Sequence, residues 1–194
     1  LDYAHAGFYE EAIDLLSHHQ AEKDQPNPLI SYYQGWFAWL AGDQAAAKSY
    51  YKTAAVQKPD FGFTNCLEEV LALQQALVIN PEDKRALYFL GNFFYAYRQH
   101  DQAVGYWEKA VDLQDDNPIT YRNLALAYFN KLGDGPKAVQ FLEKAFRLDE
   151  GSARLLMELD QLYKRLNYPA QDRLTMLEKY PELVDFRDDL YLSR

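Results

Sequence analysis

Glycine and proline are scarce in this sequence, and long apolar runs are missing from it. Only 9 glycines and 8 prolines punctuate the 194 residues, which is few for an all-β protein with many tight turns. The longest apolar run near the front, residues 36–41, is bounded by Gly35 and Gly42. A membrane-spanning helix needs about 20 apolar residues. The sequence therefore predicts no membrane span and no membrane partner.

Positive charge and cysteine are also in short supply. The net charge is −9, whereas a nucleic-acid-binding protein needs a clustered positive surface, so we expect no nucleic-acid partner. Cys66 is the only cysteine, which excludes an intrachain disulfide and permits a reducing compartment. We interpret it as a small packed residue of an apolar helical stretch. We expect a cytoplasmic location and, because the chain opens at Leu1 without a leader, a segment of a longer protein.

Residue patterns of catalytic or metal sites are missing as well. Four histidines are present, and none has a partner at the spacing of a zinc motif: His5, His18, His19 and His100. No glycine-rich phosphate loop follows a strand pattern. The acidic pairs Glu10/Glu11 and Glu68/Glu69 are typical of solvated helix surfaces. The sequence therefore predicts a protein that is not an enzyme and that holds no metal and no cofactor.

What the sequence does contain is a repeat. The unit after Pro81 carries Leu87, Leu90, Gly91, Phe94, Ala103, Trp107 and Ala110. The first four positions return 34 residues later as Tyr121, Leu124, Ala125 and Tyr128, and the last three return after 35 as Ala138, Leu142 and Ala145. A third copy contributes Leu156, Leu159 and Tyr163. We assign the extra residue of the second copy to a turn at residues 133–135.

The spacing within each copy predicts two antiparallel helices with one apolar stripe apiece. One such unit cannot bury its own stripes, so neighbouring units must stack. The pattern of a large residue, Leu-Gly, an aromatic and a later Ala-x₃-aromatic resembles the tetratricopeptide repeat (TPR). This resemblance implies an all-α fold, a right-handed superhelical solenoid of antiparallel helix pairs. Small residues such as Gly91 and Ala125 would let the paired helices approach closely.

The repeat divides the chain into units, one of them shortened. The expected ranges of a single array are 1–25, 26–59, an irregular 60–80, 81–116, 117–150, 151–180 and a partial 181–194. Pro59 and Pro81 lie only 22 residues apart, so about 12 residues are missing from the irregular unit. Residues 65–79 are interpreted as a second helix, with Asn65 and Glu68 spaced as a capping box. Residues 60–64 are then either a short connector or an aromatic loop that touches a partner.

The resemblance also implies where a partner binds, because the first helices of TPR units line the concave face. The main partner-binding candidates are Trp36, Trp39, Arg85, Tyr88, Asn92, Tyr95, Arg122, Asn123, Phe129 and Arg154. The same face includes Tyr32, Leu126, Met157, Gln161, Lys164 and Arg165. This set partly resembles the clamp with which some TPR domains hold the C-terminal carboxylate of a peptide. Asn92, Asn123 and Arg154 match the clamp, whereas Tyr88 and Glu158 stand where basic residues are expected.

Several functions fit these features. The leading hypothesis is a scaffold whose basic and aromatic face binds a protein or peptide, such as an acidic or C-terminal segment. On the alternative interpretation, its arginines pair with acids of neighbouring helices. A second hypothesis is a structural spacer or docking arm for another domain of a larger bacterial polypeptide, such as one acting on carbohydrate, as the weaker resemblance of residues 187–191 suggests. A third is carbohydrate binding through Trp36 and Trp39. The sequence leaves the oligomeric state open.

Overall fold

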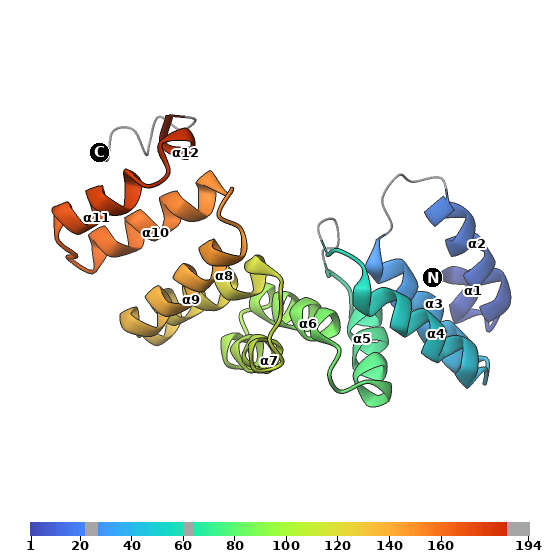
Figure 1. Cartoon of the computed structure of the whole chain (residues 1–194). Helices are drawn as coiled ribbons and strands as arrows, with labels where there is room; N and C mark the ends of the chain where they lie inside the picture. Colours follow the sequence, from blue (N-terminus) through green and yellow to red (C-terminus); the bar gives the residue numbers. More distant parts are fainter. Residues whose placement is uncertain (22–26, 60–63, 186–194) are drawn as a thin grey trace. The chain divides into compact units, whose positions relative to one another are not determined.

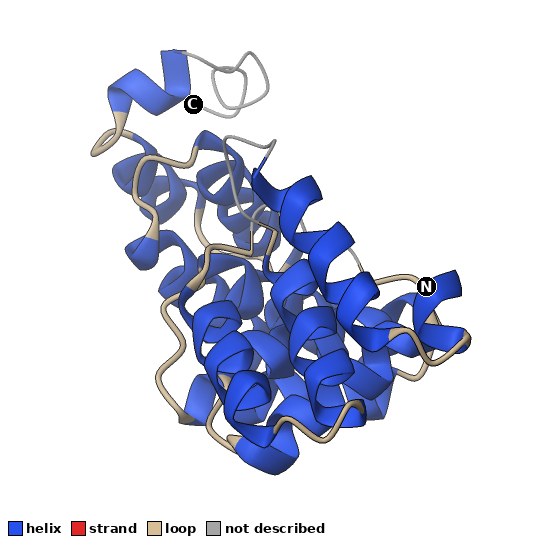
Figure 2. Cartoon of the chain, turned by 90° about the vertical axis from the view of Figure 1, so that its right-hand side faces the viewer, coloured by secondary structure: helices blue, strands red, loops and turns tan. Residues whose placement is uncertain are grey.

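A computed structural model describes residues 1–21, 27–59 and 64–185 of the chain. These residues form helices joined by loops and contain no strand, as Figures 1 and 2 show. The predicted all-helical fold of antiparallel pairs is thereby confirmed. No helix in the described ranges is long and apolar enough to cross a membrane. Residues 60–63 of the segment 60–64, interpreted as a connector or an aromatic loop, and residues 187–191 lie outside the described residues.

The chain divides into two compact units, Leu1–Leu113 and Gln114–Arg194, which we call the first and second unit. The first unit comprises α1 (Asp2–His5), α2 (Tyr9–Ala21), α3 (Pro28–Leu40), α4 (Gln44–Val56), α5 (Leu67–Ile79), α6 (Lys84–Ala96) and α7 (His100–Asp112). The second unit comprises α8 (Pro118–Ala127), a π-helical turn η1 (Tyr128–Leu132), α9 (Gly135–Leu148), α10 (Ala153–Arg165), α11 (Ala170–Leu177) and α12 (Pro181–Asp185). The helices pack chiefly as sequential pairs, α3 with α4, α6 with α7 and α8 with α9.

The small residue of the repeat is where paired helices come closest. A Cβ built on Gly91 of α6 would lie 2.3–2.7 Å from the Trp107 ring of α7. Trp107 is almost fully buried, and its Nε1 donates a hydrogen bond to the carbonyl of Tyr88 at 3.3 Å. Glycine is therefore required at residue 91 by the close approach of the tryptophan ring.

The pair α10–α11 replaces the small residues with an ion pair. Asp160 takes the place of Gly91 and Ala125, and Arg173 lies four residues after its helix N-cap, as Ala103 does. Arg173 donates from Nε and Nη2 to the two carboxylate oxygens of Asp160 at 2.8 and 2.7 Å. The side chains of Arg173 and Asp160 are only 12% and 2% exposed. A buried bidentate salt bridge thus joins the two helices where other pairs use close contact.

The helix starts follow the sequence signals, with one shift. Asn117 caps α8 by accepting from the N–H of Ile119, with Pro118 in the first turn, as the Asn-Pro pair predicts. The capping box predicted from Asn65 and Glu68 is wrong by one residue. It is Glu69 that accepts from the N–H groups of Asn65 and Cys66, at 2.6 and 3.2 Å.

The reason for the shift is that α5 begins at Leu67, with Cys66 as its N-cap. Cys66 therefore lies at the helix start and not inside the helix as expected. Its Sγ is 3.1 Å from the hydroxyl of Tyr33. The cysteine side chain is half-buried.

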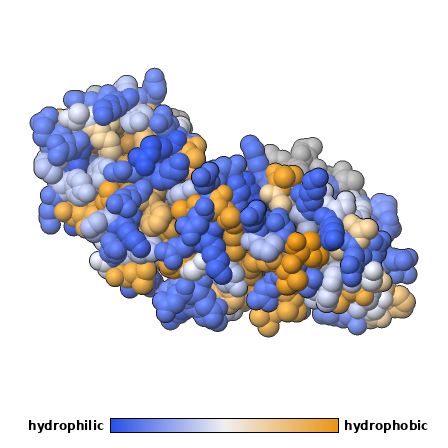
Figure 3. Space-filling model, turned by 60° about the horizontal axis from the view of Figure 1, so that its bottom comes forward, coloured by the Kyte–Doolittle hydropathy of each residue, from blue (hydrophilic) through white to orange (hydrophobic). Residues whose placement is uncertain are grey.

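Helix α5 has no partner helix of its own pair among the described residues, and it packs instead against both α3 and α6. Its Leu73 and Ala76 are fully buried in the core that it shares with those helices. Its opposite side is apolar and exposed at Leu67, Leu71 and Val78. Figure 3 shows apolar residues at the surface in several patches on the face that it draws.

The extra residue of the second repeat lies before residues 133–135, and its assignment to that turn was wrong. Each first helix ends in a turn in which an N–H bonds a carbonyl five residues back: Phe8 to Tyr3, Asp43 to Ala38, Gln99 to Phe94 and Tyr168 to Tyr163. The corresponding bond from Asp134 reaches six residues back, to Tyr128. Gly133 itself has φ +69° and matches Arg98, with φ +61°, in a turn of ordinary length. The insertion is therefore absorbed by the π-helical turn η1, whose hydrogen bonds enclose one more residue.

Candidate functional site

The second unit contains a cavity of about 200 Å³. It lies among α8–η1, α9 and α10. The apolar part of its wall comes from Ala125, Leu126, Phe129, Leu142 and Leu162. The polar part comes from Asn130, Glu158, Gln161 and Arg165. An apolar cavity with a few polar groups at its wall is the usual form of a binding pocket.

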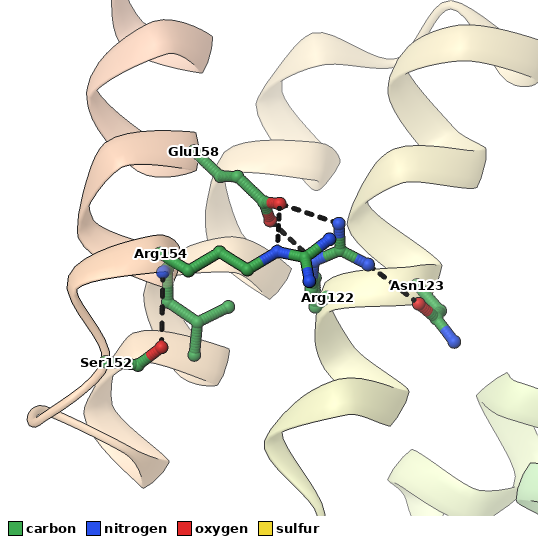
Figure 4. Close-up of polar contacts among 6 residues, drawn as sticks. Arg122, Asn123, Ser152, Arg154 and Glu158 are labelled. Atoms are coloured by element: carbon green, nitrogen blue, oxygen red, sulfur yellow. Dashed lines mark hydrogen bonds and ion pairs between the residues drawn. The ribbon is translucent and has the colours of Figure 1, made fainter. Parts of the chain in front are cut away.

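Glu158 of the cavity wall belongs to a cluster of charged side chains, whose polar contacts Figure 4 shows. Arg122 of α8 donates to both carboxylate oxygens of Glu158 on α10, from Nε and Nη2, each at 2.6 Å. Its Nη1 also donates to the side-chain oxygen of Asn123 at 3.3 Å. Arg154, one helical turn before Glu158, donates from Nε to the same carboxylate at 3.1 Å. Two arginines therefore share one glutamate.

The three charged side chains differ in exposure. Arg122 and Glu158 are 16% and 14% exposed, whereas Arg154 is 66% exposed. Burial acts to raise the pKa of Glu158, but the hydrogen bonds and charge of Arg122, and then of Arg154, outweigh it and hold this pKa below its usual range. Glu158 is thus a carboxylate at neutral pH. The cluster keeps one net positive charge, most of it accessible on Arg154.

Local helix geometry brings these residues together. Ser152 caps α10 by accepting from the N–H of Leu155 at 3.3 Å, so that α10 begins at Ala153 and Arg154 lies in its first turn. Arg154 and Glu158 are four residues apart and therefore lie on one side of the helix. Arg165, near the end of α10, has its guanidinium carbon 5.8 Å from the centre of the Phe129 ring. Aromatic and cationic groups thus meet at the cavity.

The candidates of the second unit lie around this cavity. Phe129 lines it, together with Leu126, Gln161 and Arg165, which the sequence placed on the same face. Arg122, Asn123 and Arg154 form the charged cluster beside it. The alternative interpretation, in which arginines pair with acids of neighbouring helices, describes the contacts of Arg122 and Arg154 in this structure.

The candidates of the first unit are more dispersed. Tyr88 is only 7% exposed and belongs to the core, so it offers a partner little surface. Tyr95 packs on the rings of His100 and Trp107, at centroid distances of 4.9 and 5.4 Å. Arg85 and Asn92 are half-buried on α6.

The two α3 tryptophans do not form a platform for a sugar. Trp36 packs on Phe37, with ring centres 5.6 Å apart, and contributes to the core. Trp39 is 39% exposed. A sugar platform needs exposed rings lying together, whereas Trp36 is half-buried and only Trp39 of this pair is exposed.

Sequence reasoning missed part of the cavity wall. Leu142 was predicted only as a core position of the repeat. Leu162 and Asn130 had no predicted role. Glu158 was seen only as a departure from the clamp pattern. Its spacing of four residues from Arg154 was the available signal for an ion pair.

Comparison with known families decides the classification. The family model described as "Tetratricopeptide repeat" matches residues 65–118 and 95–153. Residues 65–153 therefore belong to the tetratricopeptide-repeat family. The TPR resemblance inferred from residues 87–163 is thereby confirmed.

Solved structures agree with the TPR fold. A MamA structure designated AMB-1 shares 20% identity at a TM-score of 0.54, covering 98% of this chain and 91% of that chain. YrrB, described as "a TPR protein with an unusual peptide-binding site", shares 14% identity at a TM-score of 0.54, covering 92% and 79%. The C-terminal part of a TPR protein from Cytophaga hutchinsonii shares 16% identity at a TM-score of 0.53, covering 95% and 80%. Identities this low show the fold alone.

Proposed function

We propose that the chain is a protein- or peptide-binding scaffold, and that the cavity of the second unit with its arginines binds an extended acidic segment. The observation that carries the proposal is the exposed guanidinium of Arg154 beside an apolar cavity, in a chain whose net charge is −9. TPR proteins typically bind proteins or peptides, and YrrB is a TPR protein named for a peptide-binding site.

The three arginines have different roles in this proposal. Arg154 and Arg165 contact the carboxylates of the ligand, because both are exposed. Arg122 is engaged in two hydrogen bonds with Glu158 and positions that carboxylate against Arg154. Charge-assisted hydrogen bonds from arginine to carboxylate are among the strongest polar contacts, and each is worth about 1.5–3 kcal/mol.

The proposal predicts charge-dependent binding of a short acidic peptide. Acetyl-Gly-Asp-Phe-Asp-Glu with a free C-terminus should bind to the whole chain, and its neutral analogue acetyl-Gly-Asn-Phe-Asn-Gln amide at least tenfold more weakly. Arg154→Ala should weaken binding of the acidic peptide about tenfold, since one charge-assisted contact is lost. Isothermal titration calorimetry measures both effects.

Arg147→Ala is the matched control. Arg147 is an exposed arginine of the same unit, 57% accessible, that pairs with Glu143 of its own helix α9. Its loss changes the net charge equally and should leave the affinity within about twofold. Equal weakening by both substitutions would reduce the effect to long-range charge and count against a site at Arg154. Absence of binding by any acidic peptide would favour the docking arm instead.

A further inference from the structure

The pairs α6–α7 and α8–α9 share an aromatic stack near the end of their first helices. Phe94 stacks on Tyr106 with ring centres 5.4 Å apart, and the equivalent Tyr128 stacks on Phe141 at the same distance. Both aromatic residues are followed within a few residues by the same left-handed turn. Only the second repeat has an extra residue in the short segment between these points.

The next side chain points to different neighbours in the two repeats. Tyr95 packs back on its own pair, against His100 and Trp107 of α7. Its equivalent, Phe129, lines the cavity together with Leu142, the counterpart of Trp107, and lies under the guanidinium of Arg165 on α10. Asn130, equivalent to Ala96, also lines the cavity.

The difference coincides with the inserted residue. At the end of the π-helical turn η1, the N–H of Gly133 bonds the carbonyl of Tyr128 five residues back, and the N–H of Asp134 reaches the same carbonyl from six residues. A wider turn changes the angular position of each side chain within it relative to a regular α-helix. The segment that carries Phe129 and Asn130 is thus the one that holds the insertion.

We infer that the π-helical turn builds a selective pocket, which takes one apolar side chain of the acidic peptide. The inference rests on the proposed function and adds the determinant of specificity. The cavity of about 200 Å³ exceeds the engineered cavity of about 150 Å³ that holds benzene in another protein, so an aromatic ring or a branched aliphatic chain fits. Arg154 and Arg165 lie on the same side of α10, because their spacing is close to a whole number of helical turns, and both favour carboxylates in the ligand.

A one-residue deletion tests the inference. Deleting Lys131, an exposed residue of η1, restores the 34-residue spacing and lets α8 continue as a regular helix into the turn at Gly133. Lys131→Ala keeps the insertion and removes only the side chain, so it serves as the matched control. The probes are acetyl-Gly-Asp-Phe-Asp-Glu and the same peptide with alanine in place of phenylalanine.

Wild type and Lys131→Ala should bind the phenylalanine peptide at least tenfold more tightly than the alanine peptide. The deletion variant should bind both with equal, weaker affinity while keeping its helical circular dichroism. As a second variant, Leu126→Trp fills the cavity from α8 without shortening the chain, and it should also remove the preference for phenylalanine.

Two results would overturn the pocket and leave the proposed function standing. One is equal affinity of wild type for the phenylalanine and alanine peptides with continued loss of binding in Arg154→Ala. The other is an unchanged preference for phenylalanine in the deletion variant. If wild type binds neither peptide, the pocket and the proposed function both fail.

Discussion

Arg173→Ala is expected to lower the free energy of unfolding of the second unit by about 3–5 kcal/mol. The substitution leaves the carboxylate of Asp160 buried between α10 and α11 without its two hydrogen bonds from Arg173. Asp160 is only 2% exposed, so water cannot replace the guanidinium without local opening. Urea unfolding followed by circular dichroism measures the loss. Tryptophan fluorescence would not report on the second unit, because all three tryptophans lie in the first unit.

The double variant Asp160→Ala/Arg173→Ala is the decisive control. It restores the pair of small residues that the α8–α9 pair has at Ala125 and Ala138, with no charge left to bury. Buried ion pairs are often replaceable by apolar residues at little cost, so its stability should come within about 1 kcal/mol of wild type. A double variant as unstable as Arg173→Ala would show that the salt bridge itself is required.

Gly91→Ala is expected to destabilise the first unit by about 1–3 kcal/mol, although alanine is the better helix former. The added methyl group would meet the Trp107 ring at 2.3 Å. The ring is buried and can move only by giving up its hydrogen bond to the Tyr88 carbonyl. Tryptophan fluorescence during urea unfolding should report the loss, together with a change in the native emission of Trp107.

Gly105 of α7 provides the opposite expectation on the same helix pair. A Cβ at this residue meets nothing within 4 Å. Gly105→Ala should therefore raise the free energy of unfolding by up to about 1 kcal/mol, through helix propensity alone. Destabilisation by both substitutions, in similar amounts, would contradict the close-approach account of Gly91.

The regular part of the fold was predictable because it repeats one packing problem. Each repeat buries one apolar stripe per helix, so large buried residues recur at Leu87 and Trp107 and at their counterparts Tyr121 and Leu142. A small residue likewise recurs at Gly91 and Ala125. The Asn-Pro start at Asn117 gave the beginning of α8 in the same way. Such local signals identify a helix pair without knowledge of its neighbours.

The departures were predictable only in part, because they depend on contacts across helices. The period of 35 showed that one residue is inserted, but glycines at 133 and 135 drew the assignment to the turn, whereas the backbone absorbs the residue within η1. Asp160 at a small-residue position was visible in the sequence. Its pairing with Arg173 was not, because α11 begins one residue later after the preceding turn than α7 does. The capping role of Glu69 likewise required knowing that α5 starts at Leu67.

The candidate site shows the same division. The TPR resemblance placed Arg122, Phe129 and Arg154 on first helices, and the structure brings them to one cavity wall and its charged cluster. It did not foresee the sharing of Glu158 by two arginines, which depends on the rotamers of three long side chains. The resemblance also did not predict the burial of Tyr88. Tyr88 is buried because α6 is covered on more than one side.

The most direct test of the central claim is a residue-resolved binding map. The ¹⁵N-labelled chain would be titrated with acetyl-Gly-Asp-Phe-Asp-Glu, and the amide chemical shifts followed by nuclear magnetic resonance. Binding at the cavity and its arginines predicts that the saturable shifts concentrate at residues 122–132 and 154–165, and that Arg154→Ala reduces them. Saturable shifts that concentrate in the first unit, or none at any residue, would contradict the assignment of the site.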